Sequence, residues 1–329
     1  MKKVAVSGIQ TSGTLHLGNY LGSIKNWLDM QESHNCFFFL ANLHSITVEQ
    51  DPQILKQTIL NAVAIYLACG IDPNKSTLFL QSDVKEHTEL AWLLNCVTPM
   101  GWLKRMTQFK DKAGKHQDNA CAGLFTYPIL MAADILLYNA DVVPVGNDQK
   151  QHLELTRDIA GAINRKFQQK ILKIPEPLIQ GYATRIMSLR DGAKKMSKSD
   201  PSDASRINLI DDADTIMKKF KKSKTDNIEN ITYETDRLEV TNLINIYCSL
   251  SNLPVDKILK NYENQGFSTF KSDLAELTIE HLKPIQIEYN KIIKDPKHIL
   301  NILSTGAEKA RKNARITCNK VIENFGLSI

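Results

Sequence analysis

Segments with strand character alternate with segments of helical character over residues 1–190 of the 329-residue chain. Short apolar runs predict buried strands, and the longer stretches between them have helical periodicity. The order strand, helix, strand is typical of a parallel sheet that helices cover on both faces. Residues 1–190 are therefore predicted to form one α/β domain with a doubly wound, Rossmann-like parallel sheet. The strands are expected at Lys3–Ile9, Cys36–Leu40, Ser76–Gln81 and Asp141–Val145, and the helices at about Leu17–Gln31, Pro52–Cys69, Thr88–Asn95, Leu124–Ala133 and Gln149–Phe167.

The strand pattern ends near Asp200, and amphipathic helices follow. Residues 191–329 are predicted to form a loop and a second, all-helical domain. Whether the last helix packs back on the first domain stays open at this point. The helices are expected at about Asp212–Lys222, Glu239–Leu250, Val255–Tyr262, Phe267–Ile293 and Pro296–Phe325.

Composition and charge narrow the functional class. A formal net charge of +5 permits an RNA partner without requiring one. The first residues run directly into a strand-like segment, unlike a signal peptide, and no apolar run approaches the roughly 20 residues that span a bilayer. A cytoplasmic location without a membrane partner is therefore expected. The six cysteines form no C-x-x-C pair, which argues against a zinc ribbon or an iron–sulfur cluster, so no metal-ligating residues are predicted.

The segment from Lys194 to Asp200 gathers lysines and hydroxyl groups in a polar stretch without strand or helix periodicity. Two ammonium groups three residues apart, Lys195 and Lys198, are suited to a phosphate chain whose charge changes during a reaction. Ordinary solvated basic loops have the same composition, so this segment alone leaves both interpretations open.

The end of the first predicted strand carries a second candidate site. Three glycines, Gly8, Gly13 and Gly18, lie at the carboxyl end of this strand, where ligands dock in open α/β sheets. The helix that follows presents its N-terminus to an anion. The pattern is neither G-x-G-x-x-G nor a Walker loop. His16 precedes the helix and is a candidate hydrogen-bond donor to phosphate.

A third candidate site lies in the segment from Tyr127 to Tyr138. Spacings of four and three place Tyr127, Met131 and Asp134 on one face of a helix. That face could line a pocket in which Asp134 accepts a hydrogen bond from a ligand, among apolar groups such as Met131. Ordinary core packing is the alternative for Met131. A buried carboxylate requires a partner, which makes a purely structural role less natural for Asp134.

Together these segments resemble known signatures. His16-Leu17-Gly18-Asn19 is similar to the HIGH signature, and Lys195-Met196-Ser197-Lys198-Ser199 is the KMSKS signature of class I aminoacyl-tRNA synthetases. The helix with Met131 resembles the substrate helix of bacterial tryptophanyl-tRNA synthetases, whereas the related tyrosine enzymes usually carry glutamine at this position. The resemblance covers essentially the whole chain and weakens in the helical domain. Further matching segments are Asn42–Thr47, Arg105–Lys112, Pro144–His152 and Met187–Leu189.

The resemblance implies two sets of binding residues. Catalytic roles fall to Lys195, Lys198 and His16. Contacts with ATP are implied for Gln10, Thr11, Ser12, Gly18, Asn19, Gly146, Asn147, Asp148, Ile186, Lys195, Met196, Ser197, Lys198 and Ser199, and contacts with tryptophan for Asp134, Met131, Tyr127, His44, Gln149 and Val6. Lys110 and Lys112 are further candidates for the phosphates, with a solvated basic turn as the alternative.

Three positions depart from the family pattern. Thr11 stands where proline is common, which makes the first loop less constrained. Val6 stands where a larger aromatic residue is common at the pocket floor. His16 agrees with the class signature, although many bacterial tryptophan enzymes have threonine at this position.

The resemblance further implies the reaction and its partners. L-Tryptophan and ATP would give tryptophanyl-adenylate and pyrophosphate, and the tryptophanyl group would then pass to the 3′ end of tRNA(Trp). ATP is a substrate, and Mg²⁺ is expected to be bound mainly through its phosphates. A homodimer is expected, with anticodon recognition by the helical domain and no DNA partner. Two basic clusters are candidates for RNA phosphates: Lys218, Lys219, Lys221, Lys222 and Lys224, and Lys309, Arg311, Lys312, Arg315 and Lys320.

Three alternatives stay open on the sequence. A tyrosyl-tRNA synthetase is the nearest and is distinguished by Met131. The second is a catalytically idle relative that binds RNA or a small ligand with the same fold. The third is a small-molecule nucleotidylyltransferase on a related sheet, for which the long helical domain has no use.

Overall fold

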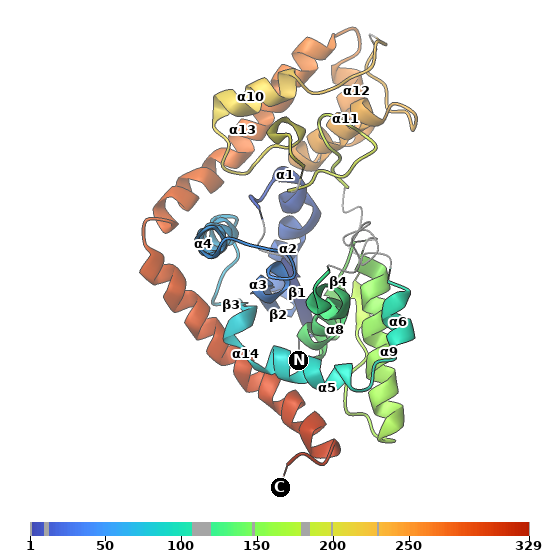
Figure 1. The fold of residues 1–329 in the computed structure, drawn as a ribbon. Coiled ribbons are helices and arrows are strands. Elements are labelled where there is room, and N and C mark those ends of the chain that lie inside the picture. The colour runs from blue at the N-terminus through green and yellow to red at the C-terminus, as the bar shows by residue number, and fades with distance from the viewer. Residues whose placement is uncertain are drawn as a thin grey trace.

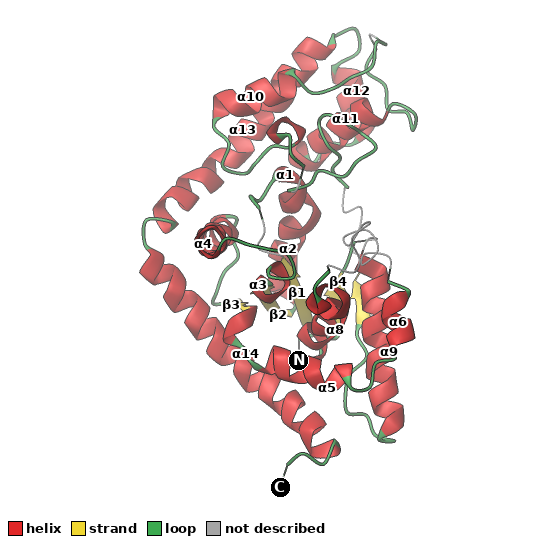
Figure 2. Cartoon of the chain, viewed as in Figure 1, coloured by secondary structure: helices red, strands yellow, loops and turns green. Residues whose placement is uncertain are grey.

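A computed structural model describes residues 2–9, 13–106, 120–146, 149–178, 185–198, 200–228 and 230–328. Within these ranges the chain forms a parallel sheet with helices on both faces and a second, helical region (Figures 1 and 2). The expected fold class is confirmed.

Five parallel strands form the sheet, in the order β3-β2-β1-β4-β5. Their bounds are β1 (Val4–Ile9), β2 (Asn35–Leu40), β3 (Ser76–Leu80), β4 (Val142–Pro144) and β5 (Glu176–Leu178). The four expected strands are confirmed, and β5 is an element that sequence reasoning missed. It has three residues, includes Pro177 and lies at the sheet edge, so it has no apolar run to signal it. The order reverses between β1 and β4, which defines the switch point where ligands bind in such sheets.

Alternation along β2 creates two apolar cores, one on each face of the sheet. Phe38 stacks on Trp27, with ring centroids 4.6 Å apart. Phe37 faces the other way and stacks on Tyr138 at 4.5 Å. The first face is covered by α2 (Lys25–Ser33) and α4 (Pro52–Ala68), and the second by α5 (Glu86–Asn95), α8 (Ala122–Leu136) and α9 (Lys150–Lys166).

The helices differ from expectation mainly at their ends. The first expected helix is a short α1 (Leu17–Asn19), a π-helical turn (Tyr20–Ile24) and α2 in direct succession. Two short helices, α3 (Asn42–Ser45) and α6 (Met100–Lys104), and the 3₁₀ turn η2 (Gln81–Asp83) had no helical periodicity long enough to predict them. A further 3₁₀ turn, η5 (Asp203–Ser205), follows the basic loop.

The helical region contains α10 (Ala213–Lys221), α11 (Leu238–Ser251), α12 (Val255–Asn261), α13 (Phe267–Ile292) and α14 (Pro296–Asn324). Each lies within one residue or so of its expected bounds. The last helix, α14, runs back along the α/β region and packs against β3 and α5 (Figure 1). Its backbone passes so close to the edge strand that a Cβ on Gly306 would lie 1.9 Å from the carbonyl oxygen of Leu78. The division of the chain at residue 190 stays a prediction.

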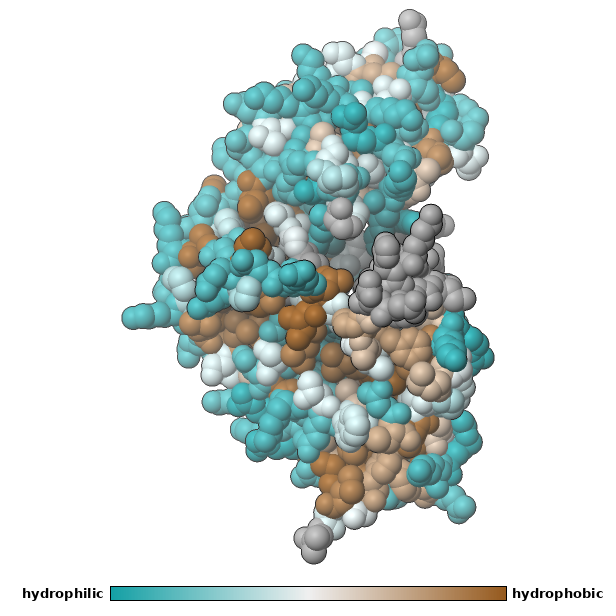
Figure 3. Space-filling view, viewed as in Figure 1, coloured by the Kyte–Doolittle hydropathy of each residue, from teal (hydrophilic) through white to brown (hydrophobic). Residues whose placement is uncertain are grey.

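The surface of the helical region is mainly hydrophilic in the view of Figure 3, whereas hydrophobic residues gather on the α/β region. Among the described residues, no helix combines the length and the apolar character needed to cross a membrane.

Candidate functional site

A cavity of about 320 Å³ opens at the carboxyl ends of β1 and β4, at the switch point of the sheet. Its volume lies at the low end of the roughly 300–1,000 Å³ that is usual for small-molecule sites. The six residues predicted to bind tryptophan all line this one cavity: Val6, His44, Tyr127, Met131, Asp134 and Gln149. Segments that are far apart in the chain therefore meet here because β1, β2 and β4 end beside one another.

Asp134 projects from α8 into this cavity and is 1 % exposed. Its Oδ1 accepts hydrogen bonds from Gln81 Nε2 at 2.7 Å and from His87 Nδ1 at 2.6 Å. Its Oδ2 lies 2.8 Å from His44 Nε2. Burial by itself raises the pKa of Asp134, but the hydrogen bonds from the two histidines outweigh burial and lower that pKa to about 2. Asp134 is therefore a carboxylate at neutral pH.

His87 has one arrangement of its ring proton that satisfies both neighbours. The ring is fully buried, with Nδ1 beside the Asp134 carboxylate and Nε2 2.7 Å from the Tyr138 hydroxyl. A carboxylate only accepts, so Nδ1 carries the proton and Nε2 accepts from the hydroxyl. Burial and the nearby carboxylates of Asp134 and Glu86 raise the pKa of Tyr138 well above its usual value, which keeps that hydroxyl a donor. The chain of donors runs from Tyr138 through His87 to Asp134.

The remaining walls of the cavity are mainly apolar and aromatic. Phe39 and Met131 contribute to them, and Tyr127 donates or accepts through its hydroxyl at 3.0 Å from His152 Nε2. Gly8 is required in β1, because a Cβ at this position would lie 2.6 Å from the ring of Phe39. Val6 is fully buried at the cavity wall. A mainly apolar cavity with a buried carboxylate is suited to a flat apolar ligand that carries a hydrogen-bond donor.

The first loop and the start of the helix that follows it pack against the basic loop and the chain that follows the basic loop. The backbone N–H of Leu17 donates to Ile207 O at 2.8 Å, and that of Leu209 donates to Leu15 O at 3.0 Å. Gly13 has φ +71, and a Cβ there would lie 2.9 Å from Cβ of Lys198. The first loop thus packs directly against the basic loop, although the two are about 180 residues apart in the sequence.

The basic loop is held in place by Met196, which is buried, whereas the lysines on either side of it are at least partly exposed. Met196 is buried, its N–H donates to Ile186 O at 3.0 Å, and its Cβ lies 3.4 Å from the position of a Cβ on Gly18. Lys195 is exposed, and Lys198 and Ser197 are half-buried. A side chain at position 18 would therefore occupy the space between His16 and Met196.

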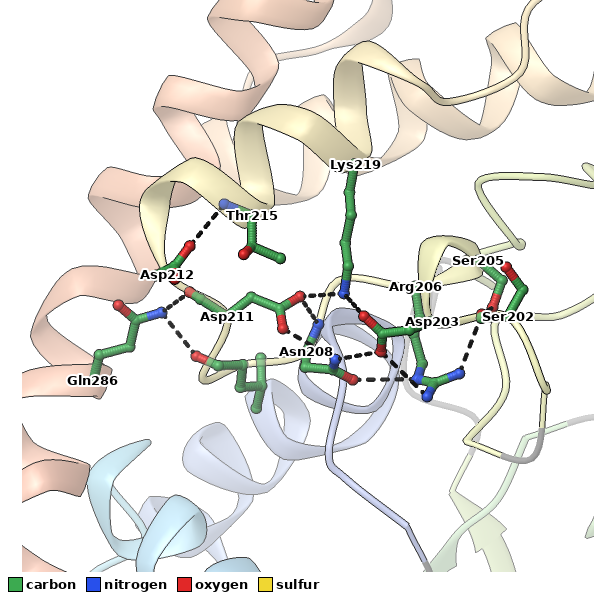
Figure 4. A network of polar contacts seen from close by, with 11 residues as sticks. Ser202, Asp203, Ser205, Arg206, Asn208, Asp211, Asp212, Thr215, Lys219 and Gln286 are labelled. Atoms are coloured by element: carbon green, nitrogen blue, oxygen red, sulfur yellow. Dashed lines mark hydrogen bonds and ion pairs between the residues drawn. The ribbon is translucent and has the colours of Figure 1, made fainter.

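A polar network fixes the chain that follows the basic loop (Figure 4). Lys219 reaches down from α10 and lies 2.6 Å from a carboxylate oxygen of Asp203 and 2.6 Å from one of Asp211. Asn208 donates to both carboxylates, at 2.9 and 3.0 Å. Gln286 of α13 donates to the carbonyl oxygens of Leu209 and Asp211. The strand-like segment that pairs with the first loop is thereby tied to the helical region.

Two groups at this junction have displaced pKa values. Burial, with the charges of Lys198, Arg206 and Lys195, lowers the pKa of His16 to about 3, so its ring is neutral. Its Nδ1 is buried and has no hydrogen-bond partner among the described residues. Burial also lowers the pKa of Lys198 to about 8. A buried, unsatisfied imidazole nitrogen beside two ammonium groups is suited to an anionic ligand.

Some of the predicted site residues use a polar group in a hydrogen bond within the protein. Others lie outside the described residues. The Asn19 side-chain oxygen accepts from the backbone N–H of His16 at 3.1 Å and so caps α1. Gly146 accepts through its carbonyl from the Gln149 N–H at 3.0 Å. The positions outside the described residues are Gln10, Thr11, Ser12, Lys110, Lys112, Asn147, Asp148 and Ser199.

Two residues that donate hydrogen bonds to Asp134, Gln81 and His87, were not predicted from the sequence. Gln81 directly follows β3, and polar residues at the carboxyl ends of parallel strands meet at one edge of the sheet, so the topology carries a signal for it. His87 lies in the first turn of α5, and a single histidine there has no such signal.

Comparisons with known proteins identify the family of the chain. A family model described as tRNA synthetases class I (W and Y) matches residues 2–283. The tryptophan–tRNA ligase of Rickettsia bellii is 62 % identical over 330 residues, with both chains covered in full. The crystal structure of tryptophanyl-tRNA synthetase from Mycoplasma pneumoniae has a TM-score of 0.91 at 41 % identity and covers 100 % of this chain and 99 % of its own. The corresponding enzyme from Campylobacter jejuni, complexed with ADP and tryptophan, has a TM-score of 0.84 at 38 % identity and covers 98 % and 100 %.

Proposed function

The chain belongs to the class I tRNA synthetases of the tryptophan and tyrosine type, and on that premise we propose that its cavity binds tryptophan while the paired signature loops bind ATP. The chain activates L-tryptophan with ATP to tryptophanyl-adenylate and pyrophosphate, and then transfers tryptophan to the 3′ end of tRNA(Trp).

The observation that carries the tryptophan assignment is the state of Asp134. Both lone pairs of Oδ1 are occupied by Gln81 and His87, whereas Oδ2 has one described donor, His44. An ionised carboxylate oxygen with spare capacity at an apolar cavity is a partner for an indole N–H, which only donates. A tyrosine hydroxyl both donates and accepts, and Met131 offers it no hydrogen-bond group. The same observation therefore favours tryptophan over tyrosine.

In the first step, a carboxylate oxygen of tryptophan attacks the α-phosphorus of ATP, and the bond from that phosphorus to the pyrophosphate oxygen breaks. The attacking carboxylate is already a nucleophile, so the step needs no general base from the protein. Charge grows on the α-phosphate and on the departing pyrophosphate. We assign its stabilisation to Lys195 and Lys198, and we assign to the neutral His16 a hydrogen bond to phosphate.

Mg²⁺ is assigned to the ATP phosphates, whose charge it neutralises when it is bound. The described residues contain no group of three or more His, Cys, Asp or Glu side chains arranged to hold a metal ion, so no protein ligand is assigned to it. Every other contribution in the proposed mechanism comes from side chains of the chain itself.

The proposed tRNA contacts use only those cations that the fold leaves at the surface. Lys219 is 7 % exposed and is held by Asp203 and Asp211, so it is removed from the earlier candidates. Arg311 and Arg315 bind groups of the α/β region. Lys320 is half-buried and donates to Lys170 O. The exposed candidates for RNA phosphates are Lys218, Lys221, Lys222, Lys309, Lys312 and Lys224, the last of which also pairs with Glu239. A homodimer and a cytoplasmic location complete the proposal.

Pyrophosphate exchange with each of the twenty amino acids tests activity and specificity together. The expected result is exchange that depends on tryptophan, with tyrosine far less effective. Tyrosine-dependent exchange would reject the assignment of Asp134 and Met131, and the absence of exchange with every amino acid would favour a catalytically idle relative.

A further inference from the structure

Two arginines of α14 reach across to the segment that supports the indole acceptor. Arg311 Nε donates to the carbonyl oxygen of Asp83 at 2.8 Å, and Arg315 Nε lies 3.0 Å from Glu86 Oε1. Asp83 ends the turn η2, and Glu86 begins α5. Both contacts join residues that are more than two hundred positions apart in the sequence.

In the sequence, these two contacts lie next to the residues that donate hydrogen bonds to Asp134. Gln81 and His87 are the two residues that hold its Oδ1, and they stand two positions before Asp83 and one position after Glu86. The segment from Gln81 to His87 is therefore held on one side by Asp134 and on the other by α14.

A third contact of α14 acts on the other end of the donor chain. The Thr317 hydroxyl oxygen accepts from Asn139 Nδ2 at 2.9 Å. Asn139 has a left-handed backbone with φ +49, and it directly follows Tyr138, which donates to His87. The helix thus contacts the chain close to Gln81 and His87, which donate to the carboxylate, and next to Tyr138, which donates to His87.

We propose that Arg311 and Arg315 are positioning residues for amino-acid recognition, which act by holding the Gln81–His87 segment against Asp134. The inference rests on the proposed function, since it assigns the orientation of the indole acceptor to the last helix. Neither arginine lines the cavity, so the proposed effect on tryptophan is indirect and passes through that segment.

The environment of Glu86 explains why Arg315 matters. The Glu86 side chain is 3 % exposed, and its Oε2 has no hydrogen-bond partner among the described residues. A carboxylate buried in this way is costly unless a cation compensates it, and removal of the cation leaves an unpaired charge. Without Arg315, the buried Glu86 side chain loses its charged partner, and the first turn of α5, which carries His87, is expected to shift.

The helix itself is expected to remain docked when these arginines are changed. Its buried face is apolar and includes Leu303, Ala307, Ala310, Ala314 and Cys318. The arginines lie outside this face, with Arg315 61 % exposed. Variants of the arginines are therefore expected to fold, and a change in tryptophan recognition can be measured on a folded enzyme.

The test uses pyrophosphate exchange on the full-length chain with the double variant Arg311→Gln/Arg315→Gln and with each single variant. Two amino acids are compared: tryptophan, and the analogue in which sulfur replaces the indole N–H. The double variant is expected to raise the KM for tryptophan about tenfold, equivalent to about 1.4 kcal/mol, with kcat and the KM for ATP within about twofold. The KM for the analogue, which makes no hydrogen bond to Asp134, stays within about twofold.

Lys297→Gln is the matched control, because Lys297 is an exposed cation on the same helix and lies outside the proposed RNA contacts. Arg315→Lys keeps a cation for Glu86 and is expected to restore most of the tryptophan KM. An unchanged tryptophan KM in folded arginine variants would overturn the inference, and so would an equal rise for tryptophan and the analogue, since that result indicates a general loosening of the pocket. If the double variant does not fold, the single variants decide by the same criteria. A wild-type enzyme that fails to exchange with tryptophan would instead reject the proposed function.

Discussion

The replacement Asp134→Asn isolates the charge of the indole acceptor while it preserves the shape of the side chain. The amide must place its NH₂ group on one side. The Oδ1 position faces two donors, Gln81 Nε2 and His87 Nδ1, so the amide oxygen is expected there and the NH₂ group is expected to face His44 and the cavity. An indole N–H would then meet another N–H in place of a carboxylate oxygen.

The expected loss follows from the type of hydrogen bond. A hydrogen bond to a charged group contributes roughly 1.5–3 kcal/mol, and leaving a buried donor unpaired costs a comparable amount. Because Asp134 is 1 % exposed, water cannot compensate for the lost partner. We therefore expect tryptophan binding to weaken by about 2–3 kcal/mol, which is roughly 30- to 150-fold in Kd.

Calorimetric titration with tryptophan measures this loss directly, and the sulfur analogue supplies the internal control. The analogue should bind the wild type and Asp134→Asn with Kd values within about threefold of each other, and thermal unfolding checks that the variant is folded. Equal weakening for both ligands would refute the reasoning, because Asp134 would then shape the pocket without accepting from the indole. Unchanged tryptophan affinity would refute it as well.

Three further predictions concern the basic loop and the last helix. Lys195→Ala and Lys198→Ala should each lower the exchange rate by about 10²-fold with little change in tryptophan Kd, as expected for groups that act on transferring charge; near-normal exchange in both would remove the assignment. Because the charged ammonium of Lys198 is lost as pH rises through about 8, kcat/KM for ATP should fall above that pH, and Lys198→Arg should shift this fall to higher pH. Gly306→Ala should lower the unfolding free energy by about 1–3 kcal/mol in denaturant titrations, since its Cβ meets Leu78 O at 1.9 Å, whereas Gly101→Ala, with open space around it, should not.

Much of the fold could be predicted from the sequence because its elements carry strong local patterns. The run Cys36–Leu40 is apolar on both faces of the sheet, and the observed burial of β2 follows from it. The helix α4 begins at Pro52 after the cap Asp51 and ends before Gly70, whose φ is +104, so both ends are marked in the sequence. The edge strand β5 has none of these marks, and its formation depends on pairing with β4, which sequence periodicity does not contain.

The candidate site, like the fold, could be predicted from the sequence only in part. Helical spacing places Tyr127, Met131 and Asp134 on one face, and all three line the cavity. The spacing of residues along one helix does not identify the side chains that other helices and strands contribute to the site.

The partners of Asp134 show how far topology extends a sequence argument. His44 and Gln81 stand 90 and 53 positions away, and each follows a strand of the sheet, so the strand order brings both to the same edge. His87 stands 47 positions away inside a helix, where its orientation depends on how α5 docks. That docking in turn involves α14, through Arg315 and Glu86. The further a residue lies from the ligand, the more its role depends on packing between elements, and the less any local pattern can indicate it. Indole recognition by one carboxylate therefore depends on contacts that extend to the last helix of the chain.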